Sequence, residues 1–327
     1  MMFPETRSAA GRTIEVADEV GFCFGVRRAI SLTDRALDEG GPVYIFGDLV
    51  HNKNVTDQLE RKGLKKVKDV NDVSGGTMVI RAHGLPQSET ASVRAKGFDV
   101  VDATCPIVLR AQEAAQTLEE RGCQVVIIGD ANHAEIKGIL GALRKPALVV
   151  DSLEDLRAAK ADRRLRRKVG VLFQTTHALE LCKDIIGELV FMCKEVQIIN
   201  TICRPVQARQ DDALEIAERN DLMLVVGSAT SANTVELAAL CRRHNPWTRH
   251  IQSADELEDH DFQWASSIGI ASGLSTPVDI VIAVRDKLLA SPLPVRPELR
   301  PPAEALTDGE HGPQSCRLPA ADRLPMR

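Results

Sequence analysis

Three of the eight cysteines stand in the same local context, directly before a helical pattern. Cys23 lies in GFCFGVRRAI, Cys105 in DATCPIVLRAQ and Cys203 in NTICRPVQARQ. Apolar residues recur at helical spacing after each one, and Pro106 and Pro205 suit the first turn of a helix. The amides and dipole of a helix N-terminus favour a thiolate. These cysteines are therefore candidates for binding a metal.

A fixed spacing follows each of the three cysteines. A short apolar strand ends in a glycine 24 residues later, in VYIFG, VVIIG and LMLVVG. The three glycines are Gly47, Gly129 and Gly227, and the polar residues four positions beyond them are His51, His133 and Ser231. Three equal offsets are the signature of an internal repeat.

A second strand in each repeat also ends in polar residues. MVIRAHGLP offers His83, VGVLFQTTH offers Thr175 and Thr176, and SIGIASGLSTP offers Ser272, Ser275 and Thr276. Alternating strands and helices predict α/β units with mainly parallel sheets. Because ligands bind beyond the carboxyl ends of such strands, we expect three similar α/β lobes around a central cavity. Each lobe would give one cysteine and two polar loops to it.

Three cysteines are an incomplete ligand set, since zinc and cubane iron–sulfur clusters usually take four ligands. A missing fourth ligand leaves an open coordination position, which a catalytic metal needs. No CxxC pair occurs in the chain, which weighs against structural zinc. A single such cysteine would more often be a core residue, but the matching offsets favour ligands. The core interpretation holds for Cys123, Cys182, Cys193 and Cys241.

The polar residues at the strand ends indicate the kind of ligand. His51, His83, Ser231, Asn233 and Ser275 are neutral or cationic donors, suited to an anion with many oxygen atoms. Helix N-termini add the backbone amides that commonly bind phosphate. Glu135, in NHAEIKG, is costly among anion ligands unless it carries a proton. It is a candidate proton donor, with a structural acid in the first helical turn as the open alternative.

Composition narrows the class of protein. The 327 residues carry a formal net charge of −5, with 44% hydrophobic and 27% charged residues, which is ordinary for a globular enzyme. This balance predicts no general affinity for nucleic acid or anionic membranes. No stretch is long and apolar enough to span a membrane, and the N-terminus does not have the pattern of a secretory signal. We therefore expect a cytoplasmic protein without structural disulfides.

The pattern divides the chain into five segments. Residues 1–13 form an N-terminal extension, and residues 14–105, 106–202 and 203–290 form the three lobes. Residues 291–327 contain eight of the sixteen prolines and few apolar residues, so we expect a disordered tail there.

The motifs GFCFGVRRAI, VHNKNV, RAHG, DATCP, HAEIKG, QTT, TIC and SANT follow one another in this order. Over about residues 14–290 the chain thereby resembles the 4-hydroxy-3-methylbut-2-enyl diphosphate reductases of the non-mevalonate isoprenoid pathway. The resemblance implies a trefoil of three α/β lobes around an iron–sulfur cluster. It also implies a two-electron reductive dehydroxylation that gives isopentenyl and dimethylallyl diphosphate.

The resemblance also implies roles for individual residues. Cys23, Cys105 and Cys203 would bind a [4Fe–4S] cluster that keeps one open iron. Glu135 would deliver a proton, Thr175 would orient the substrate hydroxyl, and His133 would join them in the catalytic set. The substrate diphosphate would be bound by His51, His83, His133, Ser231, Asn233 and Ser275. The partners implied are the small-molecule substrate and an external electron donor such as ferredoxin or flavodoxin.

Two departures from the family pattern stand out. Ala232 replaces a second serine before Asn233, which removes one hydroxyl donor and about 0.5–1.5 kcal/mol of binding. RPVQARQ replaces a run rich in Thr and Asn after Cys203, so no side-chain contact is carried over for residues 204–208.

Two alternative functions remain at this point. An open iron also suits a hydro-lyase, which needs no external electron donor. A non-catalytic sensor of isoprenoid diphosphates is the other alternative, although binding alone does not require Glu135 and Thr175.

Overall fold

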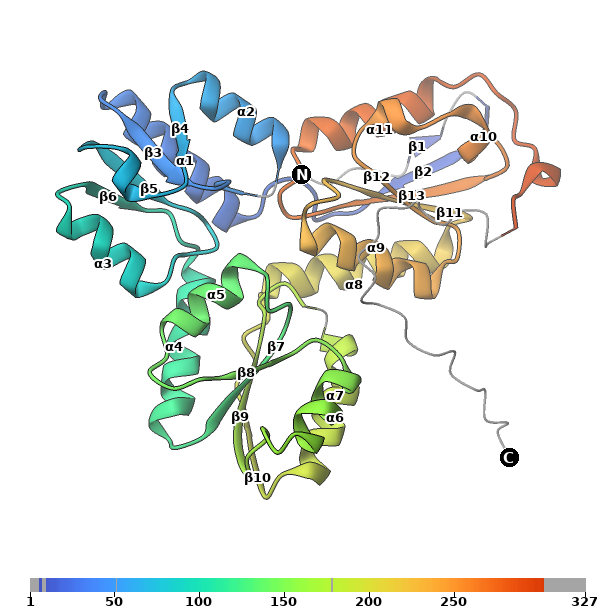
Figure 1. Ribbon diagram of the computed structural model, residues 1–327. Helices are drawn as coiled ribbons and strands as arrows, with labels where there is room; N and C mark the ends of the chain where they lie inside the picture. The colour runs from blue at the N-terminus through green and yellow to red at the C-terminus, as the bar shows by residue number, and fades with distance from the viewer. Residues whose placement is uncertain (1–5, 8–9, 51, 178, 303–327) are drawn as a thin grey trace.

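The computed structural model describes residues 6–7, 10–50, 52–177 and 179–302. They form three α/β lobes arranged around a common centre, with helices packed on the faces of each sheet (Figure 1). The buried cores consist mainly of Val, Ile, Leu and Ala side chains. The three-lobed α/β fold predicted from the repeat is therefore confirmed.

The first lobe contains a parallel four-stranded sheet in the order β4-β3-β5-β6. Its strands are β3 (Val43–Phe46), β4 (Leu64–Val67), β5 (Thr77–Ile80) and β6 (Asp99–Asp102). Its helices are α1 (Phe24–Asp38), α2 (Lys53–Arg61) and α3 (Gln87–Ala95), with a 3-10 turn η1 (Val70–Asp72).

The second lobe repeats this arrangement with the order β10-β9-β7-β8, again parallel throughout. Its strands are β7 (Gln124–Ile128), β8 (Leu148–Val150), β9 (Lys168–Phe173) and β10 (Glu195–Ile198). Its helices are α4 (Pro106–Glu120), α5 (Ala134–Gly141), α6 (Leu153–Ala161) and α7 (Leu179–Met192).

The third lobe contains the order β1-β2-β13-β11-β12, parallel except for the β1–β2 pair. Its strands are β1 (Thr6–Arg7), β2 (Thr13–Val16), β11 (Leu222–Val226), β12 (Thr248–Ile251) and β13 (Ser267–Ser272). Its helices are α8 (Arg204–Arg219), α9 (Ala232–His244), α10 (Asp259–Phe262) and α11 (Val278–Ala290), with 3-10 turns η2 (Ala254–Glu256) and η3 (Pro297–Leu299). None of the described helices is long and apolar enough to cross a membrane.

The N-terminal strand β2 belongs to the sheet of the third lobe, so the predicted start of the first lobe at residue 14 does not match the sheet pairing. β2 lies beside β13, as the blue strand within the orange lobe of Figure 1 shows. Arg12 fixes this junction, because its fully buried guanidinium donates to the Ala265 carbonyl at 2.9 Å. As a result β2, β6 and β10 occupy equivalent positions, and each strand leads to one of the three cysteines.

The start of the predicted disordered tail is ordered as far as residue 302. The Arg300 guanidinium lies 3.6 Å from the ring centroid of Trp247 and 4.9 Å from that of Trp264. Trp247 Nε1 also donates to the Pro301 carbonyl at 3.0 Å. The cation–π contacts and this hydrogen bond therefore offset the entropy lost when the segment becomes ordered. The prediction from composition did not include these contacts. Residues 303–327 lie outside the described residues.

A partly buried charged contact joins the second and third lobes. His177 follows β9, and its Nε2 lies 3.2 Å from Asp151 Oδ1 in the same lobe. Its Nδ1 lies 3.2 Å from Glu236 Oε2 on α9 of the third lobe, an ion-pair distance without the geometry of a hydrogen bond. Burial alone lowers the pKa of His177, but the two carboxylates outweigh burial and raise this pKa to about 10. His177 is therefore a cation at neutral pH.

This contact predicts a pH-dependent stability. Folded His177 keeps its proton up to about pH 10, whereas unfolded histidine loses it near pH 6.5. The stabilisation is thus complete below about pH 6.5 and is lost as the pH rises through 10, with a slope of about 1.4 kcal/mol per pH unit. Urea unfolding between pH 7 and 10 measures this loss of stability. The quantity to compare is the difference in unfolding free energy between the wild type and His177→Gln, because ionisation of the cysteines occurs in both proteins and cancels.

The control is His260→Gln, which removes a histidine whose side chain is 75% exposed. Its free energy of unfolding should follow the wild-type pH dependence. Parallel curves for the wild type and His177→Gln would contradict the assigned charge.

Candidate functional site

Each of the three predicted cysteines is the N-cap residue of a helix: Cys23 of α1, Cys105 of α4 and Cys203 of α8. Their backbone amides make equivalent hydrogen bonds, each to a carbonyl two residues beyond the end of a strand. These bonds are Cys23 to Leu274 at 3.1 Å, Cys105 to Ala82 at 2.9 Å and Cys203 to Thr175 at 2.9 Å. The repeat in sequence is thus a repeat in three dimensions, because each bond continues the pairing of the strand before the cysteine with its neighbouring strand.

The three thiols line one small cavity of about 100 Å³ at the centre of the molecule. The turn that carries Cys23 requires Gly25, since a Cβ at that position would lie 2.7 Å from Cys105 Sγ. Burial raises the pKa of Cys105 and raises that of Cys203 to about 11, although amides of the following helical turn oppose this. Neighbouring thiolates raise both further, because like charges repel. Ionising all three thiols therefore calls for a cationic partner.

The set of three thiols bears on the kind of metal centre that the cavity could hold. Ligands of one zinc ion lie about 2.3 Å from it, so its sulfurs lie about 4 Å apart. No three His, Cys, Asp or Glu residues form such a single-ion group among the described residues. A cluster of several irons binds each thiolate to a different iron and accepts wider spacing. Three thiols lining one cavity therefore suit a cluster that lacks a fourth protein ligand.

Glu135 and Thr175 form a buried pair in the same cavity. Glu135 is 1% exposed, and it accepts hydrogen bonds from Thr175 N at 2.7 Å and Thr175 Oγ1 at 2.8 Å. Burial raises the pKa of Glu135, and the two hydrogen bonds oppose this increase without cancelling it. A carboxyl group in this setting can hold a proton and release it to a ligand.

The predicted anion ligands line the same cavity, except His51, which lies outside the described residues. The His83 and His133 rings meet edge to face, with their centroids 5.4 Å apart. His133 Nδ1 accepts from Glu135 N at 3.3 Å, which leaves Nε2 as the protonated atom of a neutral ring. Ser231, Asn233 and Ser275 are buried in the same cavity.

Two positioning residues escaped the sequence analysis. Arg209 is buried and its Nη1 donates to the carbonyls of Gly21, Ser272 and Gly273 at 3.0, 3.2 and 2.8 Å. It thereby ties the turn before Cys23 to the third lobe. The sequence feature that could have indicated this role is the helical spacing of Arg209 with Val206 and Ala213, which places it on the buried face of α8.

Asn52 is the second. It caps α2 through its Oδ1, and its Nδ2 donates to the Ser275 carbonyl at 2.8 Å. The N-cap position was readable from sequence, but the link between lobes was not.

The two departures from the family pattern, Ala232 and the segment 204–208, both lie at the cavity of the three thiols. Ala232 is the first residue of α9 and lines the cavity where a serine hydroxyl would otherwise face it. In the segment 204–208, Val206 presents an apolar side chain to the same cavity.

Comparison with known proteins places these features in a family. Residues 14–289 match the family model described as LytB protein. The 4-hydroxy-3-methylbut-2-enyl diphosphate reductase of Geotalea uraniireducens is 36% identical over 84% of this chain and 95% of its own length. The protein of that name from Dehalococcoides mccartyi is 40% identical over 80% of this chain and 93% of its own.

Two solved structures are similar as well. One is described as (E)-4-hydroxy-3-methyl-but-2-enyl diphosphate reductase, the terminal enzyme of the non-mevalonate pathway. It is 37% identical with a TM-score of 0.63 and covers 84% of this chain and 98% of its own. The Plasmodium falciparum reductase structure is 25% identical with a TM-score of 0.80, covering 87% and 91%. With its three lobes, its three N-cap cysteines and this similarity over most of its length, the chain belongs to the LytB protein family.

Proposed function

We propose that the chain is a 4-hydroxy-3-methylbut-2-enyl diphosphate reductase, the activity in its relatives' names. The observation that carries the proposal is the convergence of three cysteines and the Glu135–Thr175 pair on one cavity. The reaction removes an allylic hydroxyl as water, which consumes two electrons and two protons. The products are isopentenyl and dimethylallyl diphosphate, at the end of the non-mevalonate pathway.

In this proposal Cys23, Cys105 and Cys203 hold a [4Fe–4S] cluster whose fourth iron has no protein ligand. When bound, the cluster supplies electrons one at a time and a Lewis-acidic position for the allylic oxygen. Burial and mutual repulsion disfavour free thiolates in this cavity, so it favours a cationic group that neutralises them.

The chain's own residues then bind and protonate the substrate. His51, His83, Ser231, Asn233 and Ser275 bind the diphosphate through imidazole, hydroxyl and amide donors. Thr175 Oγ1 orients the hydroxyl group, and Glu135 delivers the proton that turns the departing hydroxyl into water. His133 belongs to both sets, since its ring reaches the diphosphate side while its Nδ1 fixes the first turn of α5 that carries Glu135.

The remaining partners are part of the proposal too. The electrons come from an external protein such as ferredoxin or flavodoxin, because each turnover consumes two electrons that must be renewed before the next. The compartment proposed is the cytoplasm, where reduced thiols are available for cluster assembly.

The test is a Mössbauer spectrum of anaerobically prepared, iron-57-labelled protein, with and without the hydroxylated allylic diphosphate, paired with product analysis. We expect one iron site of the cluster to shift on substrate addition, and the two C5 diphosphates to form when reductant is supplied. Water loss without consumption of reductant would support a hydro-lyase instead. A cluster whose Mössbauer spectrum does not change on addition of the substrate would refute the proposal.

A further inference from the structure

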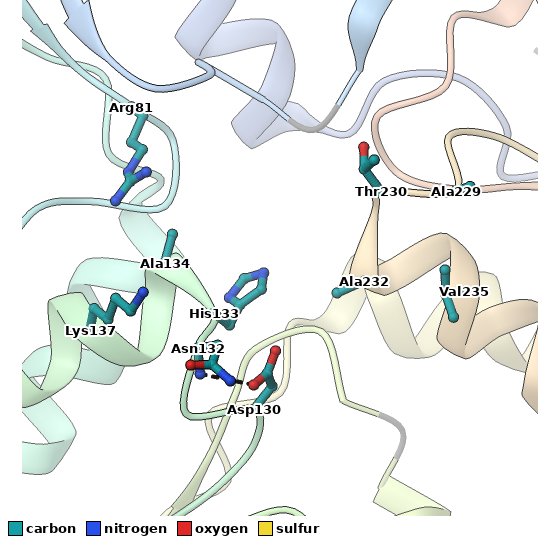
Figure 2. Close-up of a pocket in the computed structure, with 10 residues that line it drawn as sticks. All are labelled: Arg81, Asp130, Asn132, His133, Ala134, Lys137, Ala229, Thr230, Ala232 and Val235. Carbon is teal, nitrogen blue, oxygen red and sulfur yellow. Dashed lines mark hydrogen bonds between the residues drawn. The ribbon is translucent and has the colours of Figure 1, made fainter. Parts of the chain in front are cut away.

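A second, larger cavity of about 430 Å³ lies outside the inner one, where the three lobes meet (Figure 2). We call it the outer chamber. Arg81 reaches it from the first lobe, the segment from Asp130 to Lys137 from the second, and the segment from Ala229 to Val235 from the third. His133 and Ala232 line both cavities, so the outer chamber adjoins the inner one.

Arg81 is a fixed and half-buried cation in this chamber. Its Nε donates to the Gly84 carbonyl at 3.3 Å, and its Nη1 packs against Gly47. No carboxylate lies within ion-pair distance of Arg81 among the described residues. Glu89 and Asp48 act on it only from further away, and Asp48 is paired with Lys66 at 2.7 Å. A partly desolvated cation without a carboxylate in contact is costly, and an incoming anion would offset that cost.

The walls of the outer chamber differ in character. Lys137 on α5 adds a second cation, which has no ion-pair partner in the part of the chain that the structure describes. The facing wall, from the third lobe, is mostly apolar and consists of Ala229, Ala232 and Val235 with the Thr230 hydroxyl. One carboxylate is present, Asp130, whose Oδ1 accepts from Asn132 N at 2.8 Å. The chamber therefore suits a ligand with an anionic head and a short apolar chain.

The inner cavity lacks such charges. No lysine or arginine lines it among the described residues, and its predicted anion ligands are hydroxyl, amide and imidazole groups. Neutral donors recognise phosphate at short range but attract it weakly from a distance, whereas charged groups accelerate association.

We propose that the outer chamber is a diphosphate-binding subsite, in which Arg81 and Lys137 hold the diphosphate group of the substrate before it passes to the inner cavity. The apolar wall of the third lobe would lie along the hydrocarbon part. The proposal rests on the proposed function for the identity of the ligand, but the anion-binding property can be tested without any turnover.

The first experiment is calorimetric titration of cluster-loaded protein with inorganic pyrophosphate in the background Asn233→Asp. That change is isosteric, keeps an acceptor for Leu274 N at 3.0 Å, and places a charge in the inner cavity that repels anions. We expect weak pyrophosphate binding to remain. Adding Arg81→Gln and Lys137→Gln should weaken it about fivefold to tenfold at low salt, and added salt should shrink this difference.

Two further variants make the test specific. Lys65→Gln with Lys68→Gln removes the same charge from exposed positions in the first lobe and should change affinity less than about twofold. Asp130→Asn should strengthen binding about twofold to threefold, a gain that damage to the fold would not produce. The proposal would be overturned if the residual binding of pyrophosphate did not change on substitution of Arg81, Lys137 and Asp130. It would also be overturned if Asn233→Asp bound no pyrophosphate at all.

Turnover gives an independent readout. Arg81→Gln and Lys137→Gln should raise KM about fivefold to tenfold, leave kcat near the wild-type value and flatten the salt dependence of kcat/KM. Arg81→Lys should restore most of the loss. A fall in kcat that depends on the concentration of an acidic electron donor would assign the chamber to that protein and refute the subsite. If the chain binds pyrophosphate as expected but reduces nothing, the proposed function fails and the anion site stands.

Discussion

Glu135→Gln is expected to lower turnover by roughly 10²–10⁴-fold, the usual contribution of a positioned acid. Glutamine has the shape of glutamate, and its amide can keep both contacts with Thr175, so the cavity should stay intact. It has no proton to give to the departing hydroxyl. Because Glu135 is 1% exposed, bulk water cannot readily replace it. The measurement is anaerobic steady-state turnover of cluster-loaded protein with an excess of reductant.

Iron content and pyrophosphate affinity of Glu135→Gln should match the wild type, which separates loss of the proton from loss of the site. The control is Glu113→Gln, which makes the same chemical change at an exposed position of α4. If Glu135→Gln turns over within a factor of about three of the wild type, the proton reaches the substrate by another route, and the role proposed for Glu135 is wrong.

Replacing one of the three N-cap cysteines should have a comparable effect through a different cause. Cys105→Ser and Cys203→Ser each leave two thiol ligands for a cluster that usually takes four. We expect most of the bound iron to be lost and turnover to fall by about 10³-fold or more, since the open-iron chemistry goes with the cluster. Iron and sulfide analysis of anaerobically purified protein measures the first effect, and product formation the second.

Cys193→Ser is the matched control. Cys193 is also partly buried, but it lies after α7 and its Sγ donates to the Arg166 carbonyl, away from the inner cavity. Its iron content should equal that of the wild type. Equal iron retention in Cys105→Ser, Cys203→Ser and Cys193→Ser would mean that the cluster is bound elsewhere or not at all.

The internal repeat was readable from sequence because its offsets are local and equal. The stretch from each cysteine to the next glycine is one helix and one strand of constant length. The strand before each cysteine was missed because its distance to the cysteine varies: β2, β6 and β10 end at Val16, Asp102 and Ile198. Unequal loops hide a repeat from any search by fixed period.

The candidate site was predictable where chemistry depends on residue type, and not where it depends on tertiary contact. Thiols, a lone carboxyl group and hydroxyls at strand ends can be recognised in the sequence by their position in motifs. Arg209 acts through three backbone carbonyls that any sequence could supply, so nothing in the residue pattern marks its partners. The same holds for Arg81, whose significance lies in the cavity that it lines together with residues of the other two lobes.

The place of β2 in the third lobe has a consequence for how the chain is made. Arg12 and its partner Ala265 are 253 positions apart, yet the bond between them helps to hold β2, the strand that leads to Cys23, beside β13. At about 5–20 residues per second, a ribosome needs roughly 13 to 50 s to synthesise the stretch between them. During that time the first cysteine emerges with its helix but without the sheet that orients it. Assembly of the complete three-cysteine cavity must therefore be a late event, after β13 has left the ribosome.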